Sequence, residues 1–187
     1  MQNQKDALAL LKKDHLEVKQ LFKQAEEDQD SQQEIFDEIK TALGAHATIE
    51  EEIFYPAMKN ARSEKTKDEV MEALAEHKQI KALLAELSGM SGQDESFAMK
   101  LKVLKEDVEH HVKEEEGEMF PDAKKYLGEK QLAELGMRLA ARKQELMGDS
   151  EMDSESEDQS DSKRASSSSM DKSRRTTSKR STNRKSA

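Results

Sequence analysis

The sequence predicts an all-α protein: an antiparallel up-down-up-down four-helix bundle with a short fifth helix and a disordered C-terminal tail. The chain of 187 residues contains only two prolines and seven glycines, too few for the many turns of an all-β fold. Its apolar residues recur at helical spacing in stretches separated by short polar breaks. It contains no cysteine, which excludes disulfides, thiolate metal sites and cysteine nucleophiles.

Four apolar stripes mark the helices expected for the bundle. They run from Leu8 to Phe22, from Ile35 to Ile53, from Val70 to Leu87 and from Phe97 to Met119. Short polar breaks at 28–31, 61–63 and 88–94 connect them, which favours an antiparallel arrangement of neighbouring helices. A fifth helix is predicted from Glu129 to Met147, after Gly128, and we expect it to pack against the end of the bundle.

Composition divides the chain into a folded domain, residues 1–148, and a Ser-rich tail, residues 149–187. The tail begins with an acidic segment, 149–161, which holds seven acids and no base. It ends with a basic segment, 163–187, which holds nine Lys or Arg and one acid. Because the tail has almost no apolar side chains, we expect it to be disordered. It could bind nucleic acid or another polyanion, or it could only solubilise the protein.

Histidines interrupt the apolar stripes of all four expected bundle helices. His15, His46, His77 and His111 each occupy a position where the helical period calls for an apolar residue. Glu50 and Glu115 follow His46 and His111 by four residues, on the same helix face. A buried, unpaired carboxylate costs several kcal/mol. A bound cation would remove that cost, because imidazoles and carboxylates both donate lone pairs to metals.

An internal repeat relates the two halves of the domain. His15 and His77 are 62 residues apart, while His46 and His111, Glu50 and Glu115, and Pro56 and Pro121 are each 65 apart. Two helical hairpins would therefore face each other around a pseudo-twofold axis, each contributing two histidines and one glutamate. Such an arrangement favours a site with two metal ions.

These residues resemble the hemerythrin-like, HHE cation-binding family over about residues 5–127. The resemblance rests on the order of an early His, H-x-x-x-E with F-x-P, a second His, and H-x-x-x-E with F-P. It implies a four-helix bundle around a non-haem di-iron centre with terminal imidazoles and two bridging carboxylates. The metal ligands it implies are His15, His46, Glu50, His77, His111 and Glu115. Manganese or zinc would also suit these donors.

The chain departs from the oxygen-carrying hemerythrins at two points. Those proteins have an extra His one turn before the third-helix ligand, where this chain has Ala73, and they end with H-x-x-x-x-D. The resemblance therefore implies six protein ligands instead of seven. We expect a more open second metal site, filled by water or by an acid such as Glu118, and this argues against reversible O2 carriage.

Other polar and aromatic residues near the motifs have simpler interpretations. His110 is expected at the surface, about 100° around the helix from His111. Four glutamates beside the motifs most simply form a solvated helix face, although some of them could accept hydrogen bonds from the imidazoles. They are Glu51, Glu52, Glu114 and Glu116. Phe54, Tyr55 and Phe120 could wall the site or simply fill the core, and the two prolines are expected to kink or end their helices.

The favoured hypothesis is a cytoplasmic metal-binding module, and not an enzyme, that binds or senses O2, nitric oxide or peroxide. No apolar run approaches the roughly 20 residues that a membrane span requires, and the N-terminal segment has no signal-peptide pattern. A di-iron oxidase or peroxidase, or a factor that repairs iron centres, is the alternative. A stress-response protein whose basic tail binds nucleic acid is a third hypothesis. The oligomeric state is not predictable from the sequence.

Overall fold

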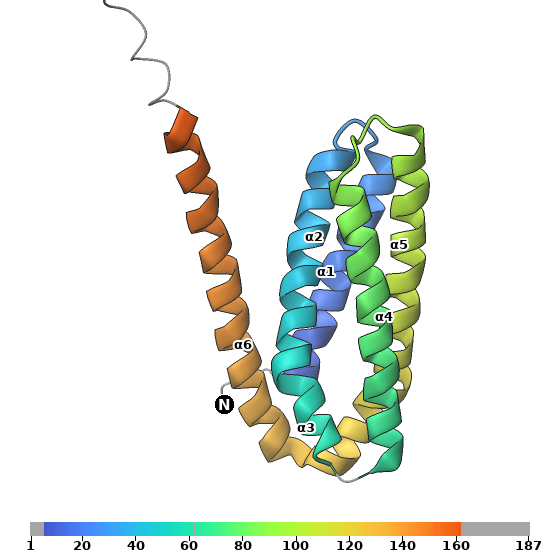
Figure 1. Cartoon of the computed structure of the whole chain (residues 1–187). Helices are drawn as coiled ribbons and strands as arrows, with labels where there is room; N and C mark the ends of the chain where they lie inside the picture. The colour runs from blue at the N-terminus through green and yellow to red at the C-terminus, as the bar shows by residue number, and fades with distance from the viewer. Residues whose placement is uncertain (1–5, 62, 162–187) are drawn as a thin grey trace, which may run out of the picture. The chain divides into compact units, whose positions relative to one another are not determined.

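A computed structural model describes residues 6–61 and 63–161, and the side chains of these as far as residue 148. All elements within this part are helical (Figure 1), which confirms the predicted all-α class. Helix α1 spans Ala7–Glu27, α2 spans Gln32–Ile49, α4 spans Glu64–Ser88 and α5 spans Glu95–Glu114. These four lie side by side, and their connections alternate between the two ends of the bundle. None of the described helices is both long and apolar enough to cross a membrane.

Two π-helical segments extend α2 and α5 instead of ending them. Segment η1, Glu50–Phe54, leads into the short helix α3, Tyr55–Lys59, and η2, Glu115–Met119, leads into α6, Phe120–Asp161. The backbone N–H groups of Tyr55 and Phe120 bond to the carbonyls of Glu50 and Glu115, five residues earlier. Each wide turn comes directly before a proline, whose ring would clash with the carbonyl four residues back in a regular α-helix. Of the two alternatives predicted for Pro56 and Pro121, the structure excludes an end of the helix at the proline, because helical backbone continues beyond each of them; a kink stays a prediction.

Gly128 divides α6 into the end of the fourth bundle helix and the start of the predicted fifth helix. Its φ of 73° and ψ of 166° are non-helical, and glycine adopts this positive φ without steric strain. Beyond this break Leu132, Leu135 and Leu139 are buried. They join an apolar cluster with residues of α1, α2 and η1, including Leu8, Leu11, Ile49 and Ile53. The fifth helix thus packs along the first hairpin.

The C-terminal tail is described only in part. Helix α6 continues to Asp161, so residues 149–161, which we expected to be disordered, are helical. Acidic residues tolerate a helical backbone, and this segment extends a helix that is already formed. Contacts group the chain into two units, Met1–Asp149 and Ser150–Ala187. Residues 162–187 lie outside the described part, and their disorder stays a prediction.

The interior of the bundle consists of two apolar clusters with a polar layer between them. One cluster includes Leu11 of α1 and Ile53 of η1, and the other includes Val18 of α1 and Leu43 of α2. Along α1, His15 lies between Leu11 and Val18, and it is buried. The predicted metal ligands form this layer. Apolar packing on both sides therefore holds the polar side chains in place.

Candidate metal centre

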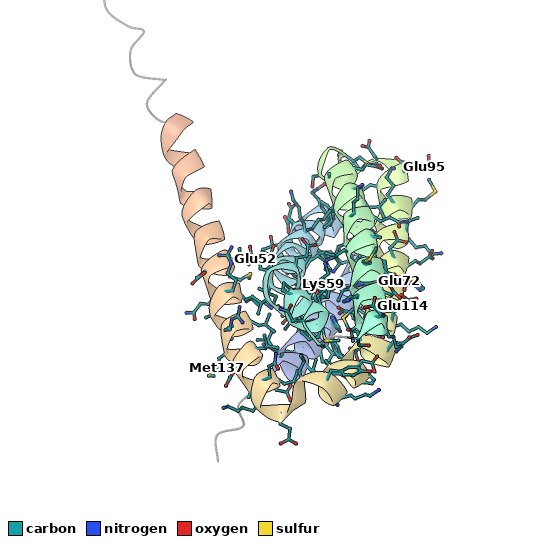
Figure 2. All side chains as sticks on the ribbon, turned by 60° about the horizontal axis from the view of Figure 1, so that its bottom comes forward. Glu52, Lys59, Glu72, Glu95, Glu114 and Met137 are labelled. Atoms are coloured by element: carbon teal, nitrogen blue, oxygen red, sulfur yellow. The ribbon has the colours of Figure 1, made fainter. Side chains whose placement is uncertain are left out.

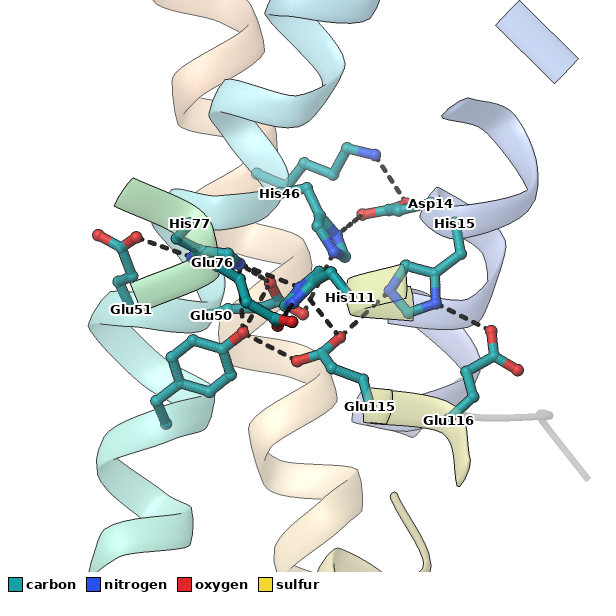
Figure 3. A network of polar contacts seen from close by, with 12 residues as sticks. Asp14, His15, His46, Glu50, Glu51, Glu76, His77, His111, Glu115 and Glu116 are labelled. Atoms are coloured by element: carbon teal, nitrogen blue, oxygen red, sulfur yellow. Dashed lines mark hydrogen bonds and ion pairs between the residues drawn. The ribbon is translucent and has the colours of Figure 1, made fainter. Parts of the chain in front are cut away.

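The structure brings all six predicted ligands into the polar layer. Each is at most 6% exposed. The four histidines lie on the four bundle helices, and each of the two glutamates lies on a π-turn. Figure 3 shows these side chains converging on one region of the interior. They are His15 on α1, His46 on α2, Glu50 on η1, His77 on α4, His111 on α5 and Glu115 on η2.

Two groups of donor atoms within this layer are compact enough to hold a cation. His15, His46, Glu50 and Glu115 each direct one donor atom to within 4.8 Å of the others. In all four the atom that faces the centre is buried without a hydrogen-bond partner; these atoms are His15 Nε2, His46 Nε2, Glu50 Oε1 and Glu115 Oε2. Buried polar atoms are almost always satisfied in native proteins, so four unpaired donor atoms that face one another fit a bound cation.

The second group contains His77, His111 and Glu50. The Nε2 atoms of His77 and His111 lie 3.2 Å apart, so both lone pairs point at the same volume. His77 Nε2 also lies 3.4 Å from Glu50 Oε2. This group therefore repeats the histidine pair of the first, as the pseudo-twofold relation predicts.

Both glutamates lie between the two histidine pairs. Glu50 places Oε1 3.2 Å from His46 Nε2 and Oε2 3.4 Å from His77 Nε2. Glu115 Oε2 lies 3.3 Å from His15 Nε2 and 3.7 Å from His111 Nε2. A carboxylate that reaches both pairs is placed to bridge two ions.

Each histidine turns its other ring nitrogen toward a carboxylate outside the layer. The Nδ1 atoms of His15, His77 and His111 are 2.8–2.9 Å from a carboxylate oxygen, and Nδ1 of His46 is 3.6 Å from one. The carboxylates belong, in that order, to Glu116, Glu51, Glu76 and Asp14. Such partners orient an imidazole and leave Nε2 as the metal donor.

These outer carboxylates also follow the internal repeat. Asp14 and Glu76 are 62 residues apart, and Glu51 and Glu116 are 65 apart. Glu51 and Glu116 were predicted as possible acceptors, but Asp14 and Glu76 were missed. The available signal was an acid directly before His15 and before His77, which is present in both halves of the repeat.

Tyr55 is a further residue of the centre whose role the sequence left open. Its hydroxyl lies 2.9 Å from Glu115 Oε1, 3.2 Å from His77 Nε2 and 3.4 Å from Glu50 Oε2. The side chain is buried, and burial followed by the nearby Glu50 and Glu115 charges raises the pKa of Tyr55 well above its usual value. The phenol is therefore protonated at neutral pH and can donate a hydrogen bond to Glu115.

The π-turn explains why Tyr55 reaches the centre. In a regular α-helix, residues five apart point about 140° away from each other. The i to i+5 bond from Tyr55 N–H to the Glu50 carbonyl widens the turn and brings the two side chains to one face. The repeat places Phe120 at the equivalent position, and its ring stacks on His15 with centroids 5.8 Å apart. At this pair of positions the two halves of the centre thus differ by one hydroxyl group.

Burial and mutual repulsion shift the pKa values of the central groups. Burial, and then the adjacent Glu115 charge, raise the pKa of Glu50 well above its usual value. Burial alone would also raise the pKa of Glu115, but close contact with His15 and the charges of His111 and His15 lower it. Of the two carboxyl groups, Glu50 is therefore the one that protonates more readily. Burial lowers the pKa of His46 to about 4, so its imidazole is neutral at pH 7.

Two other predicted positions lie outside the centre. The His110 side chain is 62% exposed, as predicted, and pairs with Glu114 at 3.2 Å and Glu76 at 3.5 Å. The Glu118 side chain is 65% exposed and pairs with Lys65 at 3.7 Å, so the structure does not place it at the second metal site; the alternative, that water fills the open position, stays a prediction. The Tyr55 hydroxyl lies beside that site instead, because the π-turn directs it inward.

The helical bundle and its buried imidazole and carboxylate donors define a metal-binding helical protein. The hemerythrin HHE cation binding domain matches residues 6–123. The chain therefore belongs to the hemerythrin HHE cation-binding family. This confirms the resemblance noted in the sequence, while the identity of the metal stays a prediction.

Similar proteins agree with this assignment. A crystal structure of a hemerythrin HHE cation binding domain-containing protein from Mycobacterium kansasii, a homolog of Rv2633c, has a TM-score of 0.68 and 28% identity. The similarity covers 77% of this chain and 88% of that one. The uncharacterized protein Rv2633c of Mycobacterium tuberculosis is 29% identical over 76% of this chain and 88% of its own length. A DNA nickase from Nostoc is 28% identical over 73% of this chain, but the match spans only 39% of the nickase.

Proposed function

We propose that the protein holds two iron ions in the polar layer of its bundle and binds or senses O2, nitric oxide or peroxide there. The observation that carries the proposal is the set of four buried donor atoms without partners, repeated by a second histidine pair. His15 and His46 would hold one ion, and His77 and His111 the other. Glu50 and Glu115 would bridge them, and the ions would neutralise two buried carboxylates that lie close together. Iron would supply redox chemistry and an affinity for small oxidants.

A small cavity beside the histidines supports a ligand of diatomic size. Its volume is about 30 Å³, and its walls include His15, His46, His77 and His111. Apolar side chains of both hairpins form most of the remaining lining, among them Val18, Leu43, Ile80, Leu84 and Val108, and the charged Asp14 and Lys81 also line it. A cavity of this size holds about one or two water-sized molecules, and its mainly apolar lining favours O2 or nitric oxide over larger charged substrates.

Metal content and magnetism test this proposal directly. Protein expressed with iron should contain two iron ions per chain whose spins are magnetically coupled, because Glu50 and Glu115 would hold the two ions close together. Zinc-loaded protein is the control, since it should bind the same number of ions and show no magnetic signal. One uncoupled iron per chain, or none, would contradict a di-iron centre.

Tyr55 favours a second candidate, an oxidase or peroxidase that uses the same centre. Its protonated hydroxyl lies within hydrogen-bond distance of Glu115 and His77, so a proton donor is present inside a buried site. This candidate requires consumption of many equivalents of peroxide or O2 per iron pair. Tyr55→Phe should reduce that turnover while leaving two irons bound. If consumption of peroxide or O2 stops at one equivalent per iron pair, the enzyme hypothesis is excluded and the hypothesis of a metal-binding module remains.

The basic tail carries a separate proposal, binding to nucleic acid or another polyanion. Nine Lys or Arg occur among residues 163–187, and this segment lies outside the described part of the chain. Contacts of this kind are independent of base sequence and weaken steeply with salt. The full chain should therefore be retained on duplex DNA at low salt, and a chain ending at residue 148 should not. Equal retention of the two chains on DNA would exclude the tail as the segment that binds nucleic acid.

A further inference from the structure

An acidic groove lies between α4 and the segment formed by α5 and η2. Its volume is about 210 Å³. Six glutamates line it, together with Ala73 and Met119. They are Glu69, Glu72 and Glu76 of α4, and Glu114, Glu115 and Glu118 of the facing segment. Figure 2 shows Glu72 and Glu114 side by side on these neighbouring helices. We call this feature the acidic groove.

The acidic groove reaches the metal centre itself. Glu115 lines it while being 1% exposed, and Glu115 Oε2 is buried without a hydrogen-bond partner. Glu76 also lines it and accepts a hydrogen bond from Nδ1 of His111 through Oε2 at 2.9 Å. One proposed bridging ligand and one outer carboxylate of the centre therefore face the groove.

The bases near the groove are fewer than its acids. Lys65 Nζ lies 2.8 Å from Glu69, 2.9 Å from Asp122 and 3.7 Å from Glu118, so one cation is shared by three acids. His110, Glu76 and Glu114 form a partly exposed group whose donor atoms lie within 4.8 Å of one another. The acids of the groove outnumber these bases, and the local potential is therefore negative.

The internal repeat provides a comparison within the same molecule. The positions equivalent to Glu69, Glu72, Ala73, Glu114 and Glu118 in the first hairpin are Ala7, Leu10, Leu11, Ile49 and Ile53. All five are apolar and belong to, or pack against, the cluster that α6 completes with Leu132, Leu135 and Leu139. The first hairpin is thus closed where the second is open and acidic.

We propose that the acidic groove is the route by which a divalent cation such as Fe²⁺ reaches the buried centre, with its glutamates as transient ligands. This inference depends on the proposed metal-binding function. Clefts lined by one sign of charge raise the local concentration of the opposite ion and speed association by about 10 to 1,000-fold. Hard divalent cations prefer carboxylate oxygens, and the exposed group of His110, Glu76 and Glu114 can hold one briefly at the surface. Glu115, at the inner end, would then receive it.

The rate of metal uptake tests the proposal. Metal-free protein is mixed anaerobically with Co²⁺, and the visible absorption of the bound ion is followed by stopped flow at low salt. The double variant Glu72→Gln/Glu118→Gln should take up cobalt at least tenfold more slowly and reach the same final number of ions. The matched control, Glu38→Gln/Glu106→Gln, removes two exposed glutamates outside the groove and should stay within twofold of the unmodified protein.

A steric variant tests the same route without changing charge. Ala73→Leu introduces the residue that already occupies the equivalent position 11, and it should narrow the groove and slow uptake at any salt concentration. Because Ala73 is also packed against the core, the charge variant remains decisive if this one fails to fold. Uptake by the charge variant at the unmodified rate would overturn the route. Failure of the unmodified protein to bind any metal would instead overturn the proposed function.

Discussion

The two hairpins of the bundle agree at their centre and differ around it. In the first, α1 and α2 supply His15 and His46, and in the second, α4 and α5 supply His77 and His111. The central and outer carboxylates repeat with the same spacing. Outside this layer the first hairpin carries apolar residues covered by α6, while the second carries the glutamates of the acidic groove.

This difference separates the inward-facing donors, which are the same residue types in both halves, from the outer positions. Identical donors in both halves fit the proposed pair of equivalent ions. The outer positions differ between the halves. In the first half, the outer positions are apolar and pack against the fifth helix, whose Lys143 also donates a hydrogen bond to Asp14 at 2.8 Å. In the second half, the outer positions carry the acids of the groove. Symmetry of the centre is therefore compatible with access from one side only.

Replacing either central glutamate should have the largest effect. Glu50→Gln and Glu115→Gln should each abolish the magnetically coupled metal pair, because each carboxylate lies between both histidine pairs. Metal binding at about 1,000 times Kd stabilises a protein by about 4 kcal/mol, and most of this gain should disappear. Metal analysis and thermal unfolding with and without metal measure both effects, with Glu38→Gln as control. Retention of the pair in only one of the two variants would break the equivalence of the halves.

Shortening a leucine on α6 should have the next largest effect. Leu139 is 0% exposed within the cluster that covers the first hairpin. Leu139→Ala should lower the free energy of unfolding by about 2–5 kcal/mol. Met137→Ala, on the same helix but at a side chain that is 54% exposed, should change it by less than about 0.5 kcal/mol. Equal urea midpoints for the two variants would mean that α6 does not contribute to the first hairpin.

Removing one hydroxyl should make the two halves of the centre more alike. Tyr55→Phe introduces at position 55 the residue type that is found at the equivalent position 120, and it removes the hydrogen bond to Glu115 Oε1. The metal-free protein should lose about 1–3 kcal/mol of stability, since Glu115 loses a buried donor. Calorimetric titration with Co²⁺ should show two more similar affinities than in the unmodified protein. Phe120→Tyr is the converse variant, and an unchanged titration in both would leave the hydroxyl without a role in metal affinity.

The smallest effect is expected at His110. Its side chain is exposed, and its pairs with Glu76 and Glu114 are surface ion pairs, which contribute about 0–1 kcal/mol. His110→Ala should therefore leave the number of bound ions unchanged, whereas His111→Ala at the adjacent position should reduce it. Metal analysis of the two purified variants distinguishes neighbours that differ only in the helix face they occupy. Equal loss in both would place His110 among the ligands.

The predicted features that depend on local periodicity agree with the structure. The helical class, the fifth helix after Gly128 and the burial of His15, His46, His77 and His111 all follow from which residues share a helix face. A polar residue within an apolar stripe is directed inward wherever that helix packs. The outer acids Asp14 and Glu76 were accessible by the same reasoning, because they precede a histidine in both halves of the repeat.

The sequence by itself determined the inward-facing residues, their pairing by the repeat and the family to which they point. The tertiary structure decided the rest. Tyr55 enters the centre only because a π-turn changes the angular relation between residues five apart, which a constant helical period does not describe. The choice of hairpin that α6 covers depends on contacts such as that of Lys143 with Asp14, separated by 129 residues. Helical periodicity specifies the face of a helix that is buried, but the element that covers it depends on packing between distant segments.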